Sequence, residues 1–183
     1  MICKYRVTLE GIKGFFRVYQ IGSEHSLYRF HKQLRSDMEF PMDQPILFKA
    51  FDAEGNVIAR YALIDLGFGT VDNITIEQTI KAGAVKFVYF YDIASKKSVT
   101  ITLESAEKGN GGLPAIIESK GPNPIEFENG YVAFEDLPEQ HRKLPGLSAS
   151  PEDDDEDLDE DDEDDEDGED ADEKEELIYD ENE

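Results

Sequence analysis

The chain has 183 residues, 43 of them acidic and 18 basic, which gives a formal net charge of −25. This length suggests one domain or at most two, and no apolar run approaches the roughly 20 residues of a membrane-spanning helix. Residues 1–10 lack the apolar core of an export signal, and the single cysteine, Cys3, excludes an intrachain disulfide and fits a reducing compartment. We therefore expect a cytoplasmic protein without membrane partners.

The charge is distributed very unevenly along the chain. Residues 152–183 contain 24 acidic residues and one lysine, whereas the residues before them contain 19 acidic and 17 basic ones. A segment with this composition repels itself and buries nothing, so we expect it to be disordered. The near-neutral remainder argues against a broad polyphosphate-binding face, and we expect no direct contact with nucleic acid. The predicted organisation is a domain over 1–137, a linker over 138–151 and an acidic tail over 152–183.

The first elements in chain order are two strands. Residues 4–9 alternate apolar and polar side chains, which is typical of a strand with one buried face. Residues 15–21 resume as a second strand after Gly11 and Gly14, so the pair predicts a hairpin.

A helix is predicted next, between Ser26 and Pro41. Its apolar stripe is spaced at three and four residues and comprises Leu27, Phe30, Leu34 and Met38. Ser26 is a suitable N-cap, and Pro41 ends the segment. The basic residues off the stripe are expected to be solvated: Arg29, Lys32 and Arg35.

The remaining pattern predicts further hairpins and a short helix. Residues 46–51 and 57–63 flank a glycine-containing loop, and 86–91 and 98–104 form the next strand pair. Thr75 and Gln78 resemble a capping box that opens the short helix, which Gly83 ends. Residues 115–119 can add a last short strand. The predicted fold class is α+β: a mixed, largely antiparallel sheet of about six strands (β-β-α-β-β-α-β-β), with one main helix packed on it.

Several of these segments resemble one protein family. The run Tyr5-Arg6-Val7-Thr8-Leu9-Glu10-Gly11-Ile12, followed by Phe16-Arg17-Val18, resembles the opening of the plasmid pRiA4b ORF-3-like proteins, some of which are TnpR-type passenger proteins of insertion elements. Similar positions recur through about residue 134, namely His31 in the main helix, the strand pair 87–103, Pro114, Pro124, Glu126, Gly130 and Tyr131. The resemblance implies an α+β domain and no particular activity.

The chain departs from this family at the turn after the strand at 86–91. Tyr91 and Asp92 match the family pattern, but its following glycine, second aspartate, tryptophan and histidine are replaced. A polar site built by those residues in relatives would be largely dismantled here.

Candidate site residues are few. His31, Tyr89, Tyr91 and Asp92 are the candidates for a small-ligand pocket, although His31 also fits a partly buried, hydrogen-bonded histidine and Asp92 a turn aspartate. The three histidines are too scattered for a metal site, and the glycines at 109–112 lack the lysine of a phosphate loop. We therefore expect no cofactor, no metal and no catalytic residue.

The acidic tail allows three uses: solubility, contact with a basic partner surface, or mimicry of nucleic acid as a decoy. Its last apolar residues, Leu177, Ile178 and Tyr179, are candidates for docking as a strand on a sheet edge. The sequence favours a non-enzymatic protein-interaction or regulatory module whose tail contacts basic partners. The alternatives are a small-ligand-binding or degenerate enzyme domain with a pocket near His31 and Asp92, and the decoy. The oligomeric state stays open.

Overall fold

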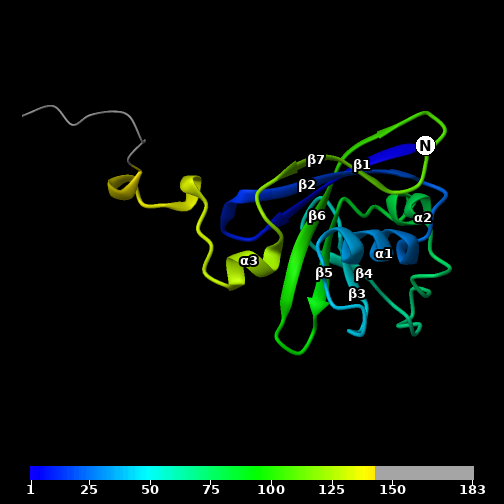
Figure 1. Ribbon diagram of the computed structural model, residues 1–183. Helices are drawn as coiled ribbons and strands as arrows, with labels where there is room; N and C mark the ends of the chain where they lie inside the picture. The colour runs from blue at the N-terminus through cyan, green and yellow to red at the C-terminus, as the bar shows by residue number, and fades with distance from the viewer. Residues whose placement is uncertain (143–183) are drawn as a thin grey trace, which may run out of the picture. The chain divides into compact units, whose positions relative to one another are not determined.

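The structure is a computed structural model, and it describes residues 1–142 (Figure 1). A seven-stranded sheet with the order β4-β3-β5-β6-β1-β2-β7 is its central feature. The strands are β1 (Ile2–Leu9), β2 (Ile12–Gly22), β3 (Leu47–Phe51), β4 (Val57–Ala62), β5 (Lys86–Asp92), β6 (Lys97–Glu107) and β7 (Ala115–Lys120). The helices are α1 (Leu27–Asp37), α2 (Ile76–Lys81) and α3 (Pro124–Glu128), followed by 3-10 turns at Phe134–Asp136 and Glu139–His141.

The predicted fold class is confirmed. The six expected strands are present, and the short segment Ala115–Lys120 forms a seventh. All six ladders between named strands are antiparallel. Strand β1 lies in the interior of the sheet, between β2 and β6, although β6 follows it by almost 90 residues in the chain. Burial alternates strictly along β3 and β5, so one face of the sheet packs on the core and the other faces solvent.

Helix α1 covers the core face of the sheet. Its predicted stripe is confirmed, because Leu27, Phe30, Leu34 and Met38 are all fully buried. The ring of Phe30 lies 5.6 Å from that of Tyr5 on β1. The hydroxyl of Ser26 accepts a hydrogen bond from the Arg29 amide at 3.4 Å, which confirms the predicted N-cap.

Helix α2 lies beside the start of α1, as Figure 1 shows. Two main-chain hydrogen bonds tie the approach to α1 to the approach to α2: the Leu27 amide donates to Ile74, and the Ile76 amide donates to His25. The predicted capping box of Thr75 and Gln78 is present in both directions. Gly83 has a φ of +92°, the left-handed conformation expected of a glycine that ends a helix.

Two sequence predictions fall wholly or mostly beyond this part of the chain. The acidic tail 152–183, with Leu177, Ile178 and Tyr179, lies outside the described residues, and so does the linker 138–151 apart from its first five residues. Within residues 1–142, no helix has the length and apolar character needed to cross a bilayer.

Candidate functional site

His31 and Arg35 lie one turn apart on α1 and share a partner on the sheet. Nδ1 of His31 is 2.9 Å from the hydroxyl of Tyr89 on β5, and Nε of Arg35 donates to the same hydroxyl at 2.7 Å. The Arg35 guanidinium also donates to the carbonyl oxygens of Pro41 and, at 3.2 Å, of Pro45. All three side chains are buried. We call these three residues the buried polar network, and it fixes α1 and the loop after it to the sheet.

The expectation that Arg35 is solvated is wrong, because its side chain is 0 % exposed. The residue lies four positions after His31, so it points toward the same side of α1. The loop of residues 38–46 folds back over it and supplies two carbonyl acceptors, which satisfy a buried guanidinium. The helical spacing of the apolar residues does not indicate that this loop returns over Arg35.

The buried setting changes how these groups titrate. Burial, with smaller contributions from Arg35 and Lys32, lowers the pKa of His31 to about 4. Burial raises the pKa of Tyr89 to about 12, against the opposing effect of the Arg35 hydrogen bond. Near neutral pH the imidazole and the phenol are both uncharged, so the predicted hydrogen-bonded histidine is confirmed. The network holds one charge, that of Arg35.

Tyr91 and Asp92 lie at a separate hollow of about 90 Å³, at the end of β5. The Tyr91 ring stacks on Phe40 at 4.0 Å, and its hydroxyl donates to Glu128 on α3 at 2.7 Å. Lys97 pairs with the same carboxylate at 2.5 Å. Burial first, then the Glu128 hydrogen bond, raises the pKa of Tyr91.

Asp92 acts as a turn aspartate, which confirms that interpretation. Its Oδ1 accepts from the Ser95 amide at 3.0 Å, and this contact lowers the pKa of its carboxyl. The structure thus divides the four candidate residues into two groups. His31 and Tyr89 belong to the buried polar network, whereas Tyr91 and Asp92 line the small hollow.

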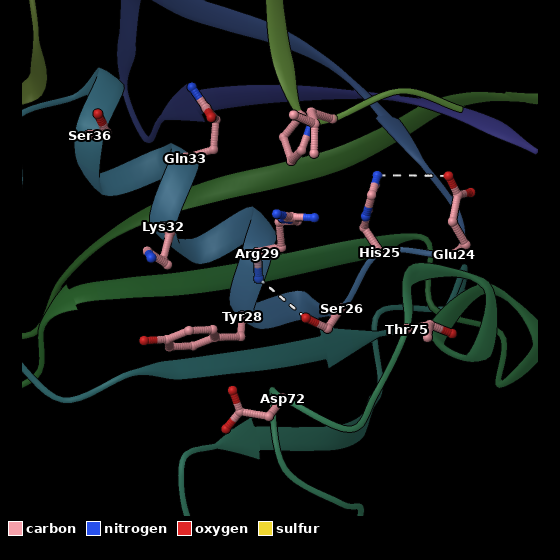
Figure 2. A pocket seen from close by; sticks show the side chains of 12 residues that line it. Glu24, His25, Ser26, Tyr28, Arg29, Lys32, Gln33, Ser36, Asp72 and Thr75 are labelled. Atoms are coloured by element: carbon pink, nitrogen blue, oxygen red, sulfur yellow. Dashed lines mark hydrogen bonds and ion pairs between the residues drawn. The ribbon is translucent and has the colours of Figure 1, made fainter. Parts of the chain in front are cut away.

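A groove of about 750 Å³ runs along the outer side of α1 (Figure 2). Residues from three separate segments line it, including Glu24, His25, Arg29, Lys32, Asp72 and Pro114. In Figure 2, Arg29 and Gln33 project from α1 on one side of the helix, whereas Lys32 and Tyr28 lie on the other side, above Asp72. We call this site the α1 groove.

The α1 groove rests directly on the buried polar network. The ring of Tyr28, which lines the groove, stacks on His31 at 5.7 Å with an interplanar angle of 25°. The helix therefore presents the groove on its outer side while His31 and Arg35 hold its inner side on the sheet. Because these contacts fix α1 on the sheet, the wall that the helix forms is already in place before a ligand binds.

The polar groups of the α1 groove suit binding better than bond chemistry. Arg29 and Lys32 take part in none of the ion pairs found within residues 1–142. His25 and Glu24 approach to 3.7 Å, beyond hydrogen-bond distance, and the Ser26 hydroxyl is engaged as a helix cap. No group of three potential metal ligands occurs in the described part of the chain.

The sequence by itself did not indicate the groove. Its helix wall was visible as a polar side of α1, formed by Arg29, Lys32, Gln33 and Ser36. The opposite walls come from loops around Asp72 and Pro114, about 40 and 80 residues further along the chain. No local pattern places those loops beside the helix.

Comparisons with known proteins support the fold alone. No protein-family model matches the chain, and no curated protein matches it. The chain is similar to the crystal structure of protein MM3350, a protein of unknown function from Methanosarcina mazei Go1, with a TM-score of 0.54 and 14% identity. The match covers 70% of this chain and 78% of that chain, so an archaeal protein shares this α+β architecture over most of its length.

Proposed function

We propose that the chain is a non-enzymatic protein-interaction module of the cytoplasm, and that the α1 groove binds an extended peptide segment of a partner. The groove carries this proposal: it is an open site on a rigid helix, lined by polar, charged and apolar side chains. The stretch of α1 from Ser26 to Ser36 spans about 15 Å. That length matches four or five residues of an extended peptide at about 3.3 Å each.

Charge and shape indicate the kind of peptide. Arg29 and Lys32 are exposed and lack ion pairs within residues 1–142, so they are available to acidic side chains of a ligand. Leu113 and Pro114 offer an apolar contact on the other wall. We therefore propose a ligand segment with acidic residues beside at least one apolar residue.

The loop between β4 and α2 supports an interaction role. It exposes four large apolar side chains within six residues: Leu63, Ile64, Leu66 and Phe68, which are 43–71 % exposed. Asp65 holds the loop in shape, because its Oδ1 accepts from the amides of Gly67 at 2.7 Å and Gly69 at 2.9 Å. An ordered cluster of exposed apolar residues is typical of a partner contact.

We propose further that the acidic tail contributes contacts to a basic partner surface, since 24 carboxylates in 32 residues carry most of the charge of the chain. A fluorescent polylysine probe tests this. The full chain should bind it with a steep salt dependence, and a chain ending at Pro151 should lose most of that binding. Equal binding by both chains would contradict the role of the tail.

The resemblance of residues 4–134 leads us to propose a divergent pRiA4b ORF-3-like domain.

A displayed library of random peptides tests the groove. Peptides selected on the full chain should be rich in acidic residues, and fluorescence anisotropy should show at least tenfold weaker binding to the Arg29→Glu/Lys32→Glu variant, or about 1.4 kcal/mol. The matched control is Lys13→Glu/Lys108→Glu, which changes the charge equally at exposed residues outside the groove. Equal losses in both variants would mean that only overall charge attracts the peptides, and the groove proposal would fail.

The alternative of a small-ligand pocket near His31 and Asp92 has less support. The hollow beside Asp92 holds about 90 Å³, whereas ligand pockets usually measure about 300–1,000 Å³. His31 lies beneath the surface with its Nδ1 already engaged by Tyr89. The α1 groove is therefore the site that we propose.

A further inference from the structure

The sheet face opposite α1 carries a second, different surface. Antiparallel register places directly paired residues on the same face. One row of pairs crosses all seven strands from edge to edge: Lys120, Phe16, Thr8, Thr100, Val88, Lys49 and Arg60. The adjacent row includes Arg6, Thr102, Lys86 and Phe51. All of these side chains are half-buried or exposed, as expected for the solvent side of the sheet.

Cations dominate this face at the β4-β3-β5 end. Arg60, Lys49 and Lys86 project from three adjacent strands, and none of them takes part in the ion pairs found among residues 1–142. Asp52, next to Phe51, and Asp92, two residues after Phe90, use their carboxylates to accept amide hydrogen bonds within turns. Glu104, the next residue of β6 on this face after Thr102, pairs with Arg6. None of the residues paired directly with Arg60, Lys49 and Lys86 across the sheet is acidic.

Aromatic rings alternate with these cations. Lys49 Nζ lies 4.8 Å from the centre of the Phe90 ring, and Lys86 Nζ lies 4.9 Å from that of Phe51. Each lysine reaches across to a ring on the neighbouring strand, so the two pairs join β3 and β5. We call Lys49, Phe51, Arg60, Lys86 and Phe90 the cation–aromatic patch.

We propose that the cation–aromatic patch binds single-stranded nucleic acid. Lysine and arginine neutralise phosphates, and aromatic rings on a sheet provide platforms on which unpaired bases stack. Threonines 100 and 102, in the same rows, add hydroxyl groups that can contact phosphate or sugar. An acidic polypeptide would match the cations but has no planar base to stack on the rings, so the rings favour nucleic acid.

The net charge of the chain does not argue against this site. The expectation of no direct nucleic-acid contact rested on the summed charge of the residues before 152, and a sum does not show how charge divides between two faces of a sheet. Contacts to phosphate act over about a Debye length, roughly 8 Å at physiological salt. Local cations on one face therefore decide whether a strand binds there.

Fluorescence anisotropy with the full chain tests the proposal. The probes are labelled 15-nucleotide strands of oligo-dT and oligo-U at several salt concentrations, which also compare DNA with RNA. The variant Lys49→Gln/Arg60→Gln/Lys86→Gln should reduce the slope of log K against log salt by about 2, because each phosphate contact to a single strand contributes about 0.7. The variant Phe51→Leu/Phe90→Leu should keep the slope and weaken binding about tenfold.

The matched control is Lys13→Gln/Lys96→Gln/Lys108→Gln, which removes three exposed lysines outside the patch and should leave the slope within about 0.5. Thermal unfolding verifies that every variant is folded. Absence of binding to the full chain at about 25 mM salt would overturn the proposal, and so would an equal loss in the control. Polyglutamate is the competitor: if it displaces the strand as well as unlabelled oligo-dT does and the Phe51/Phe90 variant binds normally, the patch binds acidic polypeptide instead.

Discussion

His31 and Arg35 illustrate how a single helix residue can be misjudged from its neighbours. Both lie on the inner side of α1 and both contact the Tyr89 hydroxyl, so a polar network occupies a place where an apolar stripe alone would be expected. Every hydrogen-bonding group of such a network must be satisfied when it is buried. The carbonyl groups of Pro41 and Pro45 complete it.

Replacing His31 tests whether the pKa of its imidazole is lowered in the folded protein. The folded-state pKa of about 4 lies below the ordinary 6.5, so the unfolded chain binds more protons between these values and stability falls as pH decreases from 6.5 to 4. The free energy of unfolding of the wild type should fall by about 3 kcal/mol relative to His31→Gln over that range. Urea unfolding at each pH measures the difference. The exposed His141→Gln is the control, and a constant difference for His31→Gln would show that His31 is protonated in the folded state.

Replacing Arg35 should be costly. The Arg35→Met variant leaves the buried Tyr89 hydroxyl and the carbonyl groups of Pro41 and Pro45 without their donor, and we expect a loss of about 3 kcal/mol in unfolding free energy. Arg29→Met removes an exposed arginine from the same helix and should change stability by less than about 0.5 kcal/mol. Urea unfolding at neutral pH compares the two. Similar small losses would mean that Arg35 does not anchor the loop.

At the scale of elements, helix α2 depends on its capping box. With six residues it is too short to be stable by itself, so its ends and its packing hold it. Thr75→Ala removes the hydroxyl that accepts from Gln78 and should cost about 1 kcal/mol. Amide hydrogen exchange should show the loss of protection concentrated at the start of α2. Thr102→Ala, at an exposed strand position, is the control, and equal effects would exclude a specific role for the cap.

At the scale of the molecule, the fold places the two surfaces that we propose for binding on opposite sides of one sheet. The α1 groove lies over the helix on one side, and the cation–aromatic patch lies on the solvent face. Because the two sites share no residue and the sheet separates them, their mutational effects should be independent. Arg29→Glu/Lys32→Glu should bind oligo-dT like the wild type, and Lys49→Gln/Arg60→Gln/Lys86→Gln should bind the selected peptides normally. Loss of both ligands in either variant would indicate one shared site.

Local patterns in the sequence determined most of the elements of this protein. The strand at 86–91, the stripe from Leu27 to Met38 and the caps at Ser26 and Thr75 were predicted correctly, because alternation, helical spacing and capping depend on residues a few positions apart. Of the candidate site, the sequence indicated His31 and Tyr89, which do meet, and the turn role of Asp92. It could not indicate the partners that reach these residues from elsewhere in the chain.

Only the tertiary structure decided the position of β1 beside β6, the burial of Arg35, the walls of the α1 groove and the gathering of Lys49, Arg60 and Lys86 on one face. Each depends on strand register or on a loop that returns from a distant part of the chain. A shift of one residue in the register of β3, β4 or β5 would move the cation of that strand to the other face of the sheet. The composition gives the number of charged residues, but the pairing between strands decides which of them lie on the same face.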